Sequence, residues 1–239
     1  MWHLAIETSG LEASLALLHC DQVVKQVDLP HEQRTTSSFA PALQSLLADV
    51  PGDAHPSLVS VSVGPGSFTG LRIGITAAKT LCFAWGCDLV AVDTLAILCH
   101  QQRGQTGHPG GPSSSHEQIA VCTNAYRGQV FMRIEPIRRT DHSPIAESRI
   151  VDRDVWEQAS AGPGIFAWGR DVEAETSASP DPTNRQRTRD RWPRPTADAL
   201  GQLAWQFYLA GQRDDYWTLT PRYLRPSAAE EKVNAALQS

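Results

Sequence analysis

Short apolar segments alternate with polar turns over the first thirty residues of the chain. Residues 4–6, 13–18 and 23–27 are largely apolar, and polar residues at 7–10 and 21–22 separate them. Brief apolar runs bounded by small and acidic residues are typical of strands joined by tight turns. The pattern therefore predicts an antiparallel meander.

A first amphipathic helix is predicted over residues 37–49, where apolar side chains recur at helical spacing. Ser37 or Ser38 can act as its N-cap, and we expect Pro41 to be tolerated because it falls in the first turn. The apolar positions of this helix are Phe39, Leu43, Leu46 and Leu47.

Strands and helices alternate after this helix. Residues 58–63 alternate in polarity as a strand does, and residues 71–85 form a mostly apolar helix that Gly86 ends. A strand at 89–92 and a helix at 94–102 follow. This succession predicts the α/β class.

A second round of elements begins after a loop-like stretch rich in glycine, proline and serine at residues 103–117. Residues 119–123 and 129–134 predict a hairpin, and a helix near 153–160 and a strand at 165–168 come next. The second half thus resembles the first, which predicts a weak internal duplication.

The C-terminal part combines a polar stretch and a helix. Residues 173–195 are rich in proline, serine, aspartate and arginine, which predicts a mobile loop. Thr196 begins an amphipathic helix that Gly211 closes. The predicted organisation is an N-terminal lobe at 1–102, a C-terminal lobe at 103–225 with loops 103–117 and 173–195, and a tail at 226–239.

Composition narrows the class of protein. The 239 residues carry a net charge of −5, which excludes a globally basic nucleic-acid binder but allows a local basic patch. Five cysteines at scattered spacings favour a reducing compartment. There is no apolar run long enough to span a membrane, and Glu7 with no early Lys or Arg argues against a signal peptide. We therefore expect a cytoplasmic protein.

The densest local signal is the glycine-rich turn at residues 64–74, between a strand and a helix. A helix N-terminus with bare backbone can hold an anion. The turn lacks the Gly-Lys-Ser/Thr of a P-loop, and three residues rather than two separate Gly66 from Gly70, unlike the dinucleotide fingerprint. On the residues alone, the alternatives are a close-packed corner, which the pattern favours, and a phosphate loop.

Five segments in this order resemble the TsaB (YeaZ) family of tRNA threonylcarbamoyladenosine biosynthesis proteins. The resemblance spans nearly the whole chain apart from the loops at 103–117 and 173–195. The matching segments are the opening strand pair at 4–9 and 14–18, the GPGSFTGLRIGI…AAK stretch at 63–79, residues 92–95, residues 124–131, and Pro221-Arg222-Tyr223-Leu224-Arg225 with Glu230 and Lys232.

The resemblance implies a two-lobed ASKHA fold of the actin and sugar-kinase type, with mixed sheets, flanking helices and a reduced second lobe. It also implies a non-catalytic subunit that joins TsaD through helices of the N-terminal lobe, can form a homodimer, and acts with TsaE on the tRNA adenosine next to the anticodon. Helix 71–85 is apolar on several faces, as at an interface. The candidate interface residues are Phe39, Leu43, Leu46, Arg72, Ile73, Gly74, Ala77, Ala78 and Leu81.

The residues offer little catalytic equipment. No two of the eight histidines are three or four positions apart. The paired metal histidines of the related catalytic subunit TsaD therefore have no counterpart in this sequence. We expect no metal site. The cysteines lie in apolar stretches and are expected to be buried rather than reactive. We expect no cofactor, although weak nucleotide binding at degenerate phosphate loops is a hypothesis; its residues are Glu7, Thr8, Ser9, Gly64, Gly66, Ser67 and Thr69.

Two departures from the family pattern and one basic run complete the picture. Thr35-Thr36 stands where the family often has His-Ser, and Asn124 stands where it often has Asp. Arginines between residues 185 and 194, with Trp192, form a local basic run. A contact with tRNA phosphates is one interpretation, and a solvated loop is the favoured one.

Two functional hypotheses follow from the sequence. The first is the non-catalytic subunit that activates TsaD, with tRNA held mainly by the partner. The second is an active ASKHA enzyme, either a nucleotide-dependent transferase or a metallopeptidase-like protein. An unrelated Rossmann oxidoreductase is a distant third, because the glycine spacing is wrong.

Overall fold

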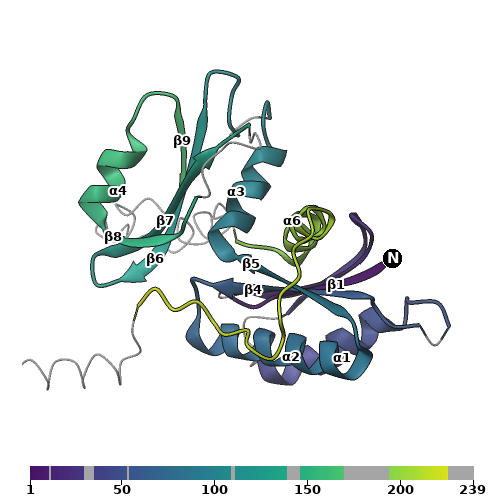
Figure 1. The fold of residues 1–239 in the computed structure, drawn as a ribbon. Helices are drawn as coiled ribbons and strands as arrows, with labels where there is room; N and C mark the ends of the chain where they lie inside the picture. Colours follow the sequence, from purple (N-terminus) through teal and green to yellow (C-terminus); the bar gives the residue numbers. More distant parts are fainter. Residues whose placement is uncertain are drawn as a thin grey trace, which may run out of the picture.

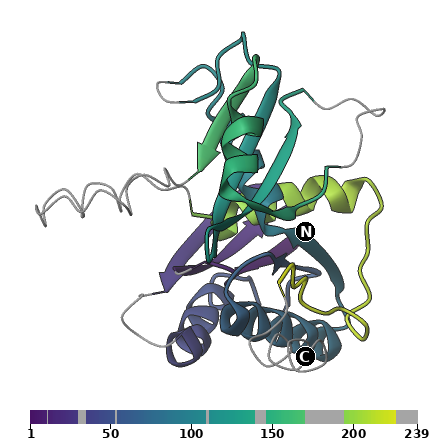
Figure 2. The same cartoon turned by 90° about the vertical axis from the view of Figure 1, so that its left-hand side faces the viewer.

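The structure is a computed structural model that describes residues 1–10, 12–29, 35–52, 54–108, 111–138, 146–169 and 194–225. Two sheets, each flanked by helices, form two lobes (Figure 1). The view turned by 90° shows the second lobe standing above the first (Figure 2).

The first lobe is built on a five-stranded sheet with the order β3-β2-β1-β4-β5. β1 (Trp2–Glu7), β2 (Ala13–His19) and β3 (Gln22–Leu29) pair antiparallel, which confirms the predicted meander. β4 (Leu58–Gly64) and β5 (Asp88–Asp93) run parallel to β1. The carboxyl ends of β1, β4 and β5 therefore meet at one edge, where the predicted site residues lie.

α1 (Thr35–Leu47) and α2 (Phe68–Trp85) cover one face of this sheet (Figure 1). Ser67 caps α2 by accepting a hydrogen bond from Gly70 N–H, and Gly86 ends the helix in the left-handed conformation, as predicted. α1 begins two residues earlier than expected, so Pro41 lies in its second turn rather than its first. Proline removes one backbone hydrogen bond, and packing of the helix on the sheet offsets that cost.

α3 (Thr94–Gly104) and α6 (Ala197–Leu209) cover the opposite face. α3 lies between the lobes: Ala96 and Ile97 pack on the first sheet, while Leu95 and Leu98 pack toward the second. The first part of the helix is buried from both sides, which explains why residues 95–99 are all apolar.

The position of α6 corrects one prediction from the sequence. The sequence places this helix in the C-terminal lobe, yet Leu200 and Leu203 pack on the first sheet, against Ala5, Ala16 and Leu18. Hydrophobic periodicity shows that a helix has an apolar face, but not which sheet that face will cover. The predicted lobe boundary at residue 102 stays a prediction, and α6, which follows it in the sequence, packs on the first lobe.

The second lobe contains a four-stranded sheet of order β8-β7-β6-β9. β6 (Gln118–Tyr126) and β7 (Gln129–Pro136) form the predicted hairpin, with β8 (Arg149–Asp152) and β9 (Ile165–Gly169) at the edges. α4 (Arg153–Ser160) is the one helix described between β8 and β9, and it packs through Trp156. The predicted two-lobed α/β architecture with a smaller second lobe is confirmed.

Several predictions lie wholly or partly outside the described residues. These are most of the loop at 173–195, the tail at 226–239 with Glu230 and Lys232, and the side chains of Thr35 and Thr36. Among the described helices, none combines the length and apolarity needed to cross a lipid bilayer.

Candidate functional site at the junction of the lobes

The glycine-rich turn packs directly on the segment that follows β1. A Cβ added at Gly66 would lie 2.4 Å from Ser9 O, and one added at Gly70 would lie 2.0 Å from Thr8 O. A Cβ at Gly74 would lie 2.2 Å from Thr8 Oγ1. These glycines are spaced four residues apart, so they fall on one face of the turn and the start of α2. Their role in the fold is to let two backbone segments approach closely.

Hydrogen bonds fasten the same two segments together. Ser67 N–H donates to Ser9 O at 2.7 Å, and Thr8 Oγ1 donates to Gly70 O at 2.8 Å. Ser9 donates from its N–H and its hydroxyl to the carboxylate of Glu7. The predicted phosphate-loop residues are therefore brought together, and Thr8, Ser9 and Ser67 use their polar groups in contacts within the corner. The geometry has the form of the close-packed corner, and nucleotide binding stays a prediction.

Glu7 is completely buried at the end of β1. Burial raises the pKa of its carboxyl group, although the hydrogen bonds from Ser9 act in the opposite direction. Its Oε2 atom is buried without a hydrogen-bond partner among the described residues, as are Ser62 Oγ and Thr94 Oγ1. These polar atoms belong to the ends of β1 and β4 and the start of α3. An ionised Glu7 would repel a phosphate at this position.

The buried side chain of His3, on β1, makes the stability of the folded chain depend on pH. Its Nε2 lies 2.8 Å from Ser60 Oγ, and burial lowers its pKa to about 3 from the usual 6.5. The unfolded chain binds a proton below pH 6.5 and the folded chain does not, so stability is full above 6.5 and falls as the pH decreases toward 3.

We therefore expect His3→Gln to reduce the loss of stability between pH ~7 and pH ~5 by about 2 kcal/mol relative to the unsubstituted chain. Urea unfolding at both pH values measures this difference. His100, whose pKa burial also lowers, is present in both proteins and cancels. Equal acid sensitivity of the two proteins would contradict the assignment.

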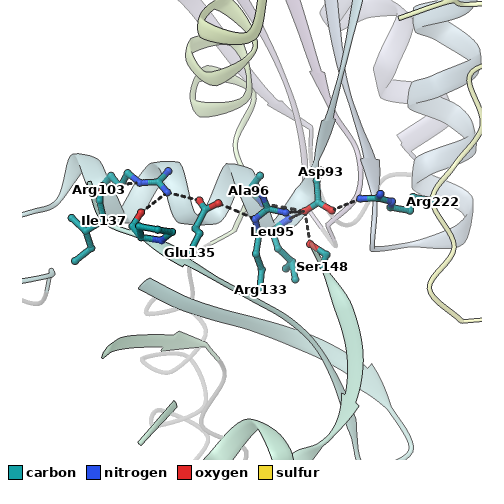
Figure 3. A network of polar contacts seen from close by, with 10 residues as sticks. Asp93, Leu95, Ala96, Arg103, Arg133, Glu135, Ile137, Ser148 and Arg222 are labelled. Carbon is teal, nitrogen blue, oxygen red and sulfur yellow. Dashed lines mark hydrogen bonds and ion pairs between the residues drawn. The ribbon is translucent and has the colours of Figure 1, made fainter. Parts of the chain in front are cut away.

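Asp93 is the centre of a polar network between the lobes (Figure 3). It is the last residue of β5, and its Oδ1 caps α3 by accepting hydrogen bonds from Leu95 N at 2.9 Å and Ala96 N at 3.1 Å. Ser148 Oγ, from the second lobe, donates to the same oxygen at 2.6 Å. A carboxylate that ends a strand, begins a helix and binds the other lobe fixes three elements at once.

Two arginines and a glutamate extend this network. The Nη1 atom of Arg133, on β7, lies 3.8 Å from Asp93 Oδ1. The Nε of the same arginine donates to Glu135 Oε2 at 3.1 Å. Arg103, near the end of α3, donates to Glu135 Oε1 at 2.6 Å and to the backbone carbonyls of residues 136 and 137 (Figure 3). α3 is thus joined to β7 along its length by alternating charges.

The C-terminal segment at residues 221–225 contacts both lobes at the junction. Arg222 N–H donates to Val63 O at 2.7 Å, and its guanidinium donates to Asp93 Oδ2 at 3.3 Å. Arg225 donates to Tyr126 O and to the side chain of Gln129, in the second-lobe hairpin. The segment at 221–225 therefore connects the glycine-rich turn, Asp93 and the second lobe. Sequence reasoning singled out this segment by resemblance alone, and no pattern in it indicates these contacts.

The predicted interface residues divide into two sets. Phe39, Leu46, Gly74 and Ala78 are buried in the chain's own core, so in this structure they are not available to a partner. Apolar periodicity identified them correctly as a packed face, but that face covers the first sheet. The remaining residues are exposed or half-buried on the outer helices: Leu43, Arg72, Ile73, Ala77 and Leu81.

The candidate metal and thiol chemistry is equally limited. Among the residues that the structure describes, no group of three or more His, Cys, Asp and Glu side chains lies close enough to share a metal ion. Cys82, Cys99 and Cys122 are buried as predicted, whereas Cys20 and Cys87 are half-buried. All five carry free thiols.

Arg194 is the one described member of the basic run. It forms ion pairs with Glu12 and Asp28 at the edge of the first sheet. The other arginines of the run and Trp192 lie outside the described residues. A contact of this run with tRNA stays a prediction.

A cavity of about 870 Å³, which the sequence did not indicate, lies between the end of α3 and α6. His100, Arg103, Asp198 and Gln202 are among its lining residues. The cavity lies at the opposite end of α3 from Asp93 and shares Arg103 with the polar network of the junction.

The fold is a two-lobed α/β architecture with a mixed sheet in each lobe, as predicted. Two solved structures from Pseudomonas aeruginosa share this fold. YeaZ matches with a TM-score of 0.67 and 18% identity over 93% of this chain and 99% of that one. A protein described as similar to peptidase YeaZ matches with a TM-score of 0.68 and 21% identity over 94% of this chain and 99% of that one.

Sequence comparison confirms the resemblance to TsaB (YeaZ). The chain is 35% identical over 131 residues to the tRNA threonylcarbamoyladenosine biosynthesis protein TsaB of Bacillus subtilis, covering 54% of this chain and 52% of the relative. TsaB of Buchnera aphidicola from Schizaphis graminum is 28% identical, covering 54% and 57%. The chain thus matches about half the length of these relatives. Residues 31–146 match the family described as TsaD, tRNA N6-adenosine threonylcarbamoyltransferase.

Proposed function

We propose that this chain acts in the biosynthesis of threonylcarbamoyladenosine in tRNA, as a non-catalytic subunit that binds and activates a TsaD-type threonylcarbamoyltransferase. The similarity to proteins named TsaB supports the pathway. The shared fold with YeaZ and the match of residues 31–146 to the TsaD family support a partner of related architecture, because related folds can pair in a pseudo-symmetric way.

The observation that carries the proposal is the outer face of α2. Thr69, Thr76, Thr80 and Ala84 are exposed along this helix, and Ile73 and Ala77 are half-buried beside them. The face is therefore made of small or apolar uncharged side chains from one end to the other. Small side chains let a second helix approach closely, and a depletion of charge is typical of interface cores.

The two cations of α2 are engaged by the C-terminal segment. Arg72 stacks over Phe68 at 3.9 Å and donates to Tyr223 Oη at 3.0 Å. Lys79 donates to the carbonyls of Trp217 and Leu219. These contacts hold both charges against the chain itself, which leaves the small-residue face for a partner helix.

The remaining assignments follow from this role. With a net charge of −5, this chain is not the main tRNA holder, so tRNA is bound mainly by the partner, and TsaE acts with the pair. A second copy of this chain competes for the same α2 face as a homodimer. No metal or cofactor of its own is required, and the assembly works in the cytoplasm.

We expect Thr76→Arg to weaken binding to a TsaD protein at least tenfold, equivalent to about 1.4 kcal/mol, because a long charged side chain would enter the centre of the contact. Sizing with light scattering measures the complex, and threonylcarbamoylation of tRNA with TsaD, TsaE and threonylcarbamoyl-AMP measures activation.

The matched control is Gln158→Arg, which adds the same charge at an exposed position of α4. This variant is expected to bind and activate as the unsubstituted chain does. Failure of the unsubstituted chain to form a complex would refute the proposal, and so would turnover by this chain alone. Equal binding of TsaD by the two variants would show that this face of α2 does not contact the partner.

A further inference from the structure

Two cysteines face each other where α2 ends. Gly86 takes the left-handed conformation and donates its N–H to Cys82 O at 2.9 Å, which reverses the chain immediately after the helix. The reversal brings Cys87 back against the last turn, with its Sγ 3.8 Å from Cys82 Sγ. Contact between the residue after a left-handed cap and the last helical turn is a usual feature of such ends, but here both residues carry thiols.

The two thiols differ in access to solvent. Cys82 is completely buried in the core between α2 and the first sheet, while Cys87 is half-buried at the surface. The hydrogen-bonded contact between the two thiols lowers the pKa of Cys87, and the same contact together with burial raises the pKa of Cys82. Cys87 is therefore the sulfur that a small oxidant can reach first, and Cys82 is the neighbour that follows.

We propose that Cys82 and Cys87 form a thiol pair that hydroperoxides oxidise reversibly to a disulfide. The Cys87 thiolate attacks one oxygen of hydrogen peroxide, the O–O bond breaks, and hydroxide leaves, giving a sulfenic acid at Cys87. The Cys82 sulfur then attacks the Cys87 sulfur, forming the S–S bond. The sulfenic oxygen leaves as water with the thiol proton, so the pair loses two electrons to the peroxide.

The local structure allows this bond with small movements. The sulfurs must approach from 3.8 Å to about 2 Å, which rotation about the side-chain bonds of Cys87 can provide because that residue is at the surface. The bond would close a short ring around Gly86 and hold the end of α2. Short-range disulfides of this kind are readily reduced, so the pair is expected to return to thiols in a reducing compartment.

The remaining cysteines provide internal comparisons. Cys99 is buried and its pKa is raised well above the usual value by burial, so it is expected to react slowly. Cys20 is half-buried like Cys87, but among the described residues no second cysteine contacts it. A response that needs two adjacent thiols should therefore appear at Cys87 and not at Cys20.

The test uses the full reduced chain treated with hydrogen peroxide and analysed by peptide mass spectrometry. Trypsin releases the segment from Thr80 to Arg103, and chymotrypsin cuts after Phe83 and Trp85, between the two cysteines. We expect the two fragments to stay joined, with the loss of two hydrogen atoms, until dithiothreitol separates them. Alkylation of Cys87 before treatment should be at least about tenfold faster than that of Cys99.

A matched set of variants identifies the order of the steps. In Cys82→Ser, Cys87 should accumulate as a sulfenic acid that dimedone traps, and in Cys87→Ser no disulfide should form. Cys20→Ser should behave as the unsubstituted chain. Absence of the joined fragments in the unsubstituted chain would overturn the proposal whether or not Cys82→Ser folds, and so would equal oxidation of Cys20 and Cys87. None of these readouts needs a partner protein, so the result is independent of the proposed function.

Discussion

Replacing Gly70 with alanine is expected to destabilise the fold by about 3 kcal/mol or more, because the added Cβ would overlap a backbone oxygen. That atom would lie 2.0 Å from Thr8 O and 3.2 Å from Thr8 C. The Thr8 segment cannot move away cheaply, since Thr8 and Ser9 hold the turn through hydrogen bonds to Gly70 and Ser67. Urea unfolding of the purified variant measures the change.

The matched control is Gly104→Ala at the end of α3, where an added Cβ meets no atom within 4 Å. This substitution is expected to be neutral or slightly stabilising, because alanine has the higher helix propensity. If both variants lost the same stability, the loss would come from replacing any glycine rather than from the close packing at the turn. A stable Gly70→Ala protein would show that the two backbone segments do not meet as described.

Glu135→Ala is expected to destabilise the protein by about 3–5 kcal/mol, because it removes the anion from a buried network and leaves two arginines without it. The side chains of Glu135 and Arg133 are only 2% and 7% exposed, so water cannot replace the lost partner. Hydrogen exchange should increase mainly in α3 and β7, the two elements that the network joins.

The exposed ion pair between Lys25 and Asp49 supplies the comparison. Asp49→Ala should cost less than about 1 kcal/mol, because solvent screens that pair. A double variant, Arg133→Met with Glu135→Leu, should recover part of the loss, because it replaces the Arg133 charge with apolar contacts while Arg103 stays without its anion. If Glu135→Ala cost no more than Asp49→Ala, the network would not hold the lobes together.

Most elements were predictable because they have a local signal, whereas the short strand β8 was not predicted. The period-2 alternation of residues 58–63, the apolar run after the glycine-rich turn and the left-handed glycine at 86 all depend on neighbouring residues. Boundaries were less accurate at α1, where Pro41 suggested a later start than the structure shows. Proline disfavours a helix interior, but packing against the sheet outweighs that preference.

The candidate site was predictable only in part. The sequence indicates a candidate phosphate site at Glu7, Thr8, Ser9 and the glycines, and the structure brings these residues together. What the sequence could not show is that the glycines accommodate the Thr8-Ser9 backbone. Close approach and anion binding both favour glycine, so only the position of the second segment distinguishes them.

The sequence by itself determined two α/β lobes, a glycine-rich corner and a chain without paired metal histidines. The tertiary structure decided that α6 returns to the first sheet, that Asp93 joins both lobes to the C-terminal segment, and that Cys82 meets Cys87. The physical reason is range: periodicity and turn chemistry act between near neighbours, whereas these contacts depend on which buried surfaces and charges meet after folding.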